Sequence, residues 1–103
     1  MNNITITHHQ KLARVTACVA LVFNEDYNGL RGFRDPKTKA QAAYVAKKIT
    51  GYGDGVISTF YRINTSYMVN CFEDVEIEIA LDDDLLVKCE TVANLWKLIT
   101  RSE

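Results

Sequence analysis

The chain has 103 residues, of which 48% are hydrophobic and 24% are charged, and its formal net charge is −1. This composition is that of an ordinary globular protein, and it excludes an intrinsically disordered chain, which has fewer apolar residues and a larger net charge. We expect one compact domain over residues 1–103, in which residues 1–11 form either a loose tail or a short edge strand.

Nothing in the sequence has the features of a membrane or secreted protein. No apolar run reaches the roughly 20 residues that span a bilayer, and the N-terminal residues lack the basic and apolar regions of a signal peptide. Cys18, Cys71 and Cys89 are odd in number and form no C-x-x-C pair. We therefore expect a cytoplasmic protein with buried free thiols, no metal site and no cofactor.

The stretch Arg14–Phe23 is the most apolar part of the chain. Only Thr16 among the nine residues after the arginine is strongly polar. Such a run is typical of a strand that is buried on both faces, so we expect a central strand from about Leu12 to Phe23. Ile4 and Ile6 alternate with threonines and indicate an additional short strand if the tail is ordered.

A helix is expected after the polar connection that follows this strand. Asp35-Pro36 is a helix-start signal, and the helix should run from Pro36 to about Thr50. Gly51 is placed to take the left-handed conformation that ends a helix.

Three short strands are expected next, at about 56–63, 67–72 and 75–81, with Glu73-Asp74 as one of the turns between them. In the last strand, alternation predicts that Val75, Ile77, Ile79 and Leu81 point inward. The acids Asp82–Asp84 should then cap a final helix from Leu85 to about Arg101.

Together these elements predict an α+β fold with the order β-α-β-β-β-α, optionally with an extra N-terminal strand. Its antiparallel sheet would carry two helices packed on one face. The position of the first strand stays open, because its two apolar faces require either a covered place in the sheet or a partner.

Charge is unevenly distributed along the chain. Residues 1–72 carry nine basic and four acidic side chains, and residues 73–103 carry three basic and nine acidic ones. The stretch Glu73–Asp84 holds seven acids and no base, either as a solvated hairpin and helix cap or as a surface for a basic protein partner. In the second case the acids imitate a row of phosphates. The candidate residues in this stretch are Glu76, Glu78, Asp82 and Asp83.

The stretch Arg31–Lys48 has the opposite charge, with six basic residues and one acid, Asp35. It is either a solvated helix face or a nucleic-acid-binding segment with interleaved aromatic residues. The helix–three-strand–helix order predicted for residues 36–101 is similar to that of double-stranded RNA-binding domains. However, Asp82–Asp84 stand where those domains carry lysines, and negative charge would repel a phosphate backbone.

The twelve-residue connection Asn24–Asp35 is long enough to expect a functional role. Its apolar residues either cover the core or, with its arginines, form an exposed set of anchors of the kinds enriched at binding hot spots. The candidate partner-binding residues from this connection and the helix after it are Tyr27, Leu30, Arg31, Phe33, Arg34, Tyr44 and Lys48.

No catalytic motif is present. The glycine clusters at 29–32 and 51–55 match neither the phosphate-loop nor the dinucleotide pattern, and a Cys–His nucleophile would require His8 or His9 to reach a largely apolar cysteine. We therefore predict a non-enzymatic protein.

The sequence favours a small protein-binding module, acting as an inhibitor or adaptor, whose partner has a basic surface. Compact domains with charged surfaces and no catalytic motif are typical of phage and mobile-element genes, so a viral protein that blocks a host nuclease or defence complex is one version. Nucleic-acid binding through Arg31–Lys48 and self-association as a homodimer are the alternatives.

Overall fold

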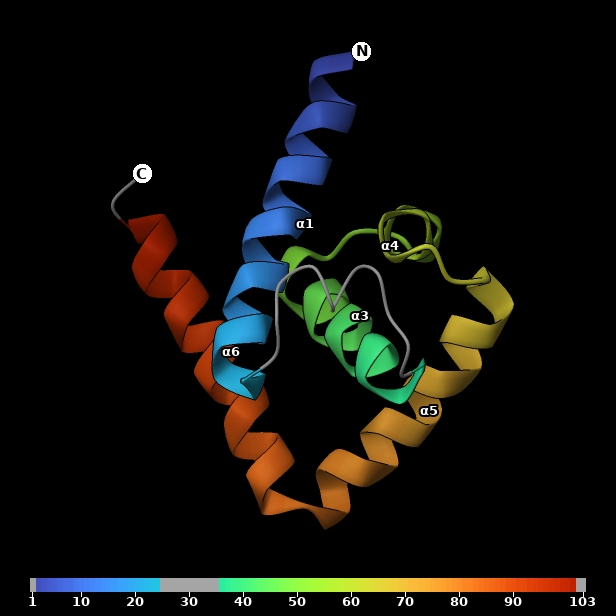
Figure 1. Cartoon of the computed structure of the whole chain (residues 1–103), viewed down its shortest axis with the longest axis vertical. Helices are drawn as coiled ribbons and strands as arrows, with labels where there is room; N and C mark the ends of the chain where they lie inside the picture. The colour runs from blue at the N-terminus through green and yellow to red at the C-terminus, as the bar shows by residue number, and fades with distance from the viewer. Residues whose placement is uncertain (1, 25–35, 102–103) are drawn as a thin grey trace.

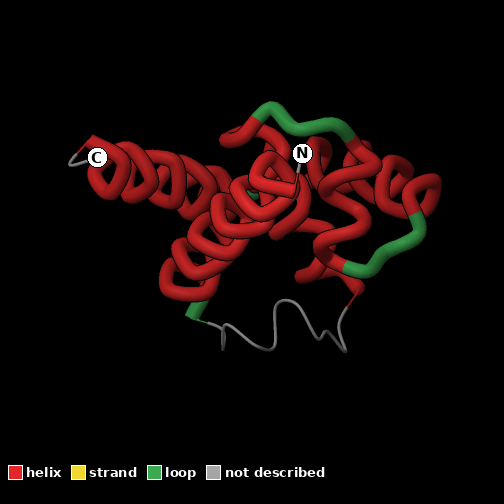
Figure 2. Tube along the Cα trace, turned by 90° about the horizontal axis from the view of Figure 1, so that it is seen from above, coloured by secondary structure: helices red, strands yellow, loops and turns green. Residues whose placement is uncertain are grey.

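The computed structural model describes residues 2–24 and 36–101. Within these two ranges the chain forms five helices and no strand, and Figure 2 shows only helix and connecting loops there. The predicted α+β fold with an antiparallel sheet is therefore wrong: the described chain is a helical bundle.

The predicted central strand lies inside a helix, α1 (Asn2–Phe23). Residues 2–11, expected as a loose tail or edge strand, belong to the same helix. Leu12, Val15, Thr16 and Val19 are buried at helical spacing, whereas Ala17 is exposed. A short apolar run rich in β-branched residues is compatible with a buried strand and with a buried helix. Here the helix buries one side of the run and leaves Leu21, on the other side, 72% exposed.

The three predicted strands after Gly51 are also helical. Residues 56–61 of the first lie in α4 (Asp54–Tyr61), and the other two, with the predicted turn Glu73-Asp74, form one continuous helix, α5 (Thr65–Leu81). Asn64 caps α5, because its side-chain oxygen accepts a hydrogen bond from the Tyr67 N–H at 3.0 Å. Met68, Phe72 and Val75 are buried at positions i, i+4 and i+7, which is the spacing of one helix face.

The two predicted helices are confirmed as α3 (Pro36–Thr50) and α6 (Asp83–Arg101). Gly51 has φ 73°, and its N–H donates to the Lys47 carbonyl at 2.8 Å, so it ends α3 as predicted. Asp82 caps α6, because its Oδ1 accepts hydrogen bonds from the N–H groups of Asp84 and Leu85 at 3.0 and 3.3 Å.

Helix α3 lies at the centre of the bundle, where it contacts α1, α4, α5 and α6 (Figure 1). Four alanines of α3 are buried: Ala40, Ala42, Ala43 and Ala46. Because alanine has a small side chain and the best helix propensity, it lets several helices pack closely around one. Helices α5 and α6 meet at Asp82 and form a V in Figure 1, while α1 packs against α3 and α6.

A buried pair of hydroxyl groups joins α1 to α4. The Thr16 Oγ1 lies 2.7 Å from the Tyr61 hydroxyl and also donates to the Leu12 carbonyl at 2.7 Å. Thr16 and Tyr61 are both fully buried, so the polar residue that interrupts the apolar stretch of α1 is satisfied within the core.

Candidate functional site

The acidic corner is the surface formed by the second half of α5, Asp82 and the first turn of α6, residues 73–87. Asp82 alone separates the two helices, and its backbone is extended, with φ −127° and ψ 102°. Its N–H donates to the Glu78 carbonyl at 2.8 Å, and its carboxylate caps α6. One residue therefore ends the first helix and starts the second.

All seven acids of Glu73–Asp84 lie at this corner. Six of them are exposed, whereas Glu78 is half-buried and forms an ion pair with Lys37 of α3 at 3.0 Å. Of the predicted site residues, Asp82 and Asp83 lie next to each other where the two helices meet. Glu76 and Glu78 are two positions apart in α5 and so point to different sides of that helix, with Glu78 directed toward α3.

Large apolar side chains are exposed among these acids. The exposed fraction is 59% for Ile77 and 83% for Leu81 at the end of α5, and 40% for Leu86 and 57% for Val87 at the start of α6. Ile77 and Leu81 lie one helical turn apart, so their side chains are neighbours. The acidic corner is consequently both strongly charged and partly apolar.

The sequence prediction placed Ile77 and Leu81 inside the core, which is wrong. At about 100° per residue they lie on the face of α5 opposite to Met68, Phe72 and Val75. A helical projection of residues 65–81 would have identified them, whereas the alternating pattern of residues 75–81 concealed them.

The basic stretch is only partly described by the structure. Tyr27, Leu30, Arg31, Phe33 and Arg34 lie outside the described residues. Tyr44 and Lys48 are on α3, where the Lys48 ammonium lies 5.3 Å from the centre of the Tyr44 ring.

Several bases of α3 already face acids. Besides the Lys37–Glu78 pair, Lys47 forms an ion pair with Asp54 of α4 at 2.6 Å. Helix α3 packs directly on α5, where the Tyr44 and Phe72 rings are 5.6 Å apart. The basic and acidic segments are therefore adjacent, and part of the positive charge of α3 is neutralised within the molecule.

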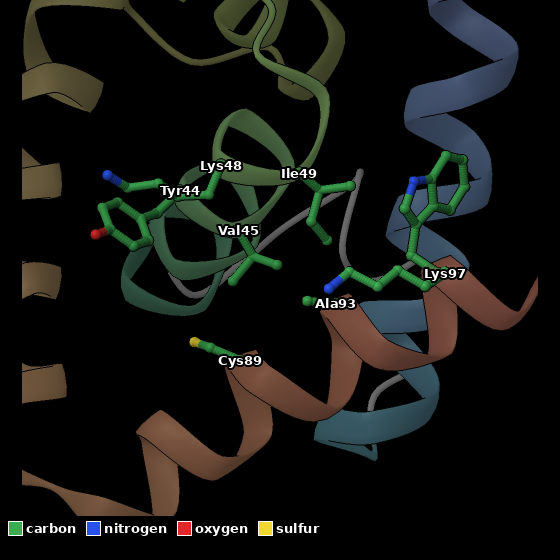
Figure 3. Close-up of a pocket in the computed structure, with 8 residues that line it drawn as sticks. Tyr44, Val45, Lys48, Ile49, Cys89, Ala93 and Lys97 are labelled. Carbon is green, nitrogen blue, oxygen red and sulfur yellow. The ribbon is translucent and has the colours of Figure 1, made fainter. Parts of the chain in front are cut away.

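A groove between α3 and α6, here called the α3–α6 groove, has a volume of about 270 Å³. Tyr44, Val45 and Ile49 line it from α3, and Cys89, Ala93 and Trp96 line it from α6. Lys48 and Lys97 complete the lining, and Figure 3 shows the Lys97 side chain extending over Ala93 toward α3.

Both histidines pack on aromatic rings, and the three cysteines are free thiols, of which Cys18 is buried as expected while Cys71 and Cys89 are half-buried. The His8 ring packs 4.4 Å from Tyr52, and the His9 ring packs 5.1 Å from Phe60, so both contact aromatic residues after α3. Burial raises the pKa of the Cys18 and Cys89 thiols, which disfavours the thiolate that a nucleophile requires. Across residues 2–24 and 36–101 no three histidine, cysteine or acidic side chains are grouped to hold a metal ion.

No described helix is both long enough and apolar enough to cross a membrane. Comparisons with known proteins gave no match: no family model, no curated protein and no solved structure is similar to this chain.

Proposed function

We propose that this chain is a small cytoplasmic protein-binding module that acts as an inhibitor or adaptor, and that the acidic corner is its binding surface. The observation that carries the proposal is the exposure of Ile77 and Leu81 among the acids of α5 and α6. An exposed group of large apolar residues rimmed by charge is typical of a protein-interaction site.

The charge of the corner defines the partner. Acids steer a basic partner to the surface and determine its orientation, while the apolar side chains supply contact area that excludes water. A protein whose basic surface normally holds nucleic acid has this chemistry, so inhibition would follow if the corner occupied that surface.

A second copy of the chain is a poorer partner for this surface. A two-fold dimer built on the corner would place the acids of one copy against those of the other, and like charges repel at close range. The corner therefore favours a different, basic protein over self-association.

The test is affinity capture from lysate followed by binding measurements on the captured protein. Leu81→Ser removes the most exposed apolar residue, and Leu98→Ser is its control, because Leu98 is 62% exposed on the distal half of α6. We expect Leu81→Ser to weaken binding by about tenfold or more, as loss of an anchor residue does, and Leu98→Ser to leave it unchanged.

The charge of the corner is tested separately. Glu73→Lys with Glu76→Lys reverses two exposed acids, and Gln10→Lys with Asn94→Lys adds two positive charges on other surfaces. We expect only the first pair to abolish capture and to weaken the salt dependence of association. Capture that survives both the charge reversal and Leu81→Ser would show that the corner is not the binding surface.

A further inference from the structure

We propose that the α3–α6 groove binds a small organic anion with an apolar body, such as a medium-chain carboxylate. This site is separate from the acidic corner and takes a ligand of the opposite charge. It uses the lysines of α3 and α6 and does not depend on the proposed protein-binding function.

The walls of the groove suit an apolar body. Apolar side chains from both helices, among them Val45, Ile49, Ala93 and Trp96, form its floor and sides. A cavity of about 150 Å³ holds benzene, so about 270 Å³ accommodates a body of roughly eight carbons. Burial, and to a smaller extent the neighbouring Glu90 carboxylate, raises the pKa of the Cys89 thiol, which keeps this side chain of the lining uncharged near neutral pH.

The charge of the groove selects an anion. Its lining contains two lysines and, among the described residues, no acid. Figure 3 shows the Lys97 side chain reaching over Ala93 between the two helices, while the Lys48 amine lies beside the Tyr44 ring. A carboxylate held by Lys97 would leave its apolar chain against Val45 and Ile49, so Lys97 is the main anion-binding residue.

The size of the groove argues for a small molecule. A protein helix is about 10 Å wide with its side chains and buries several residues at an interface. The hollow between α3 and α6 provides room for a single apolar group of limited length.

Trp96 makes the proposal directly measurable. It is the single tryptophan of the chain, it is half-buried, and it lines the groove. Octanoate titrated into the full chain should therefore change the tryptophan fluorescence in a saturable manner, with a dissociation constant on the order of 0.1–1 mM for a ligand of this size. Octylamine, which has the same chain length and the opposite charge, should bind about tenfold more weakly or not at all.

Charge-reversing variants at exposed positions test whether the lysines of the groove attract the carboxylate. Lys97→Glu should weaken octanoate binding by about tenfold, and Lys48→Glu by less, because attraction is replaced by repulsion. Lys11→Glu, at an exposed position on α1, is the matched control and should bind as the original chain does. Ala93→Phe should fill the groove and abolish saturation, with circular dichroism confirming that the variant is folded.

Three results would overturn the proposal. They are a fluorescence change that does not saturate, equal binding of octanoate and octylamine, and equal binding of octanoate by Lys97→Glu and Lys11→Glu. The outcome is independent of the acidic corner, because Leu81→Ser lies outside the groove and should leave octanoate binding unchanged.

Discussion

At the scale of single residues, polar groups in the core decide how α1 and α4 are joined. Thr16 satisfies its hydroxyl with the Leu12 carbonyl and the Tyr61 hydroxyl, both at 2.7 Å. A buried hydroxyl that loses its partner costs more than the bond itself contributes, because its desolvation is no longer compensated. The pair therefore makes the register of the two helices specific as well as stable.

Removal of this contact should have a measurable effect on stability. Tyr61→Phe is expected to lower the free energy of unfolding by about 1 kcal/mol, and Thr16→Val by about 1–3 kcal/mol. The double variant should lose less than the sum of the two, with a coupling of about 0.5–1.5 kcal/mol in urea denaturation. Tyr52→Phe, at a half-buried tyrosine, is the control and should change stability by less than about 0.5 kcal/mol. Strict additivity would show that the hydroxyl–hydroxyl bond contributes nothing.

At the scale of elements, α5 decides whether the acidic stretch is a hairpin or a helix. Asp74, a residue type that is favoured in turns, lies with Glu73 in the middle of a 17-residue helix. The buried Met68, Phe72 and Val75 hold this helix against the bundle, so packing outweighs the local preference of aspartate for turns. Exposure of Ile77 and Leu81 is the direct consequence.

A proline at position 74 distinguishes a hairpin turn from a continuous helix. A turn between two strands tolerates proline, whereas the interior of a helix loses about 3 kcal/mol or more. Asp74 is exposed, so no buried contact is removed by the substitution. We expect Asp74→Pro to reduce the midpoint of urea unfolding strongly and Asp74→Ala to leave it nearly unchanged. Similar stability of the two variants would contradict a continuous α5.

At the scale of the whole molecule, the first and last helices close the bundle. Helix α1 contacts α6, and the Lys88 ammonium lies 5.5 Å from the centre of the Phe23 ring. Val92 of α6 is fully buried in the same core as Val15 and Val19 of α1. Because the core is complete only when α6 is present, we expect α1 and α3–α5 to be unstable without α6.

Truncation tests this dependence. A chain that ends at Asp82 lacks α6 and should lose cooperative thermal unfolding while it gains binding of an apolar dye, because its exposed core resembles that of a molten globule. A chain that ends at Ile99 lacks only residues 100–103, of which two belong to α6, and should still unfold cooperatively. Cooperative unfolding of the shorter chain would show that α1 and α3–α5 fold without α6.

The candidate site was predictable in part. The sequence alone indicated the acids of the corner, because the seven acids between residues 73 and 84 are close together along the chain in any fold. It did not indicate that Ile77 and Leu81 are exposed there, because their exposure depends on whether the segment is a helix or a strand. The α3–α6 groove combines residues about 45 positions apart, and no local pattern brings Tyr44 and Lys48 to Ala93 and Lys97.

By itself, the sequence determined the helix of residues 36–50 and the last helix from about residue 85 to residue 101, because Asp35-Pro36, Gly51 and the acids before the last helix are local signals that act within one turn. Only the tertiary structure decided that Leu12–Phe23, residues 56–61 and residues 65–81 are helical. Differences in local propensity are below about 1 kcal/mol per residue, whereas burying one large apolar side chain contributes about 1.5–3 kcal/mol. The arrangement that buried Val15, Tyr61, Met68 and Phe72 together around the alanines of α3 therefore outweighed the strand preference of these segments.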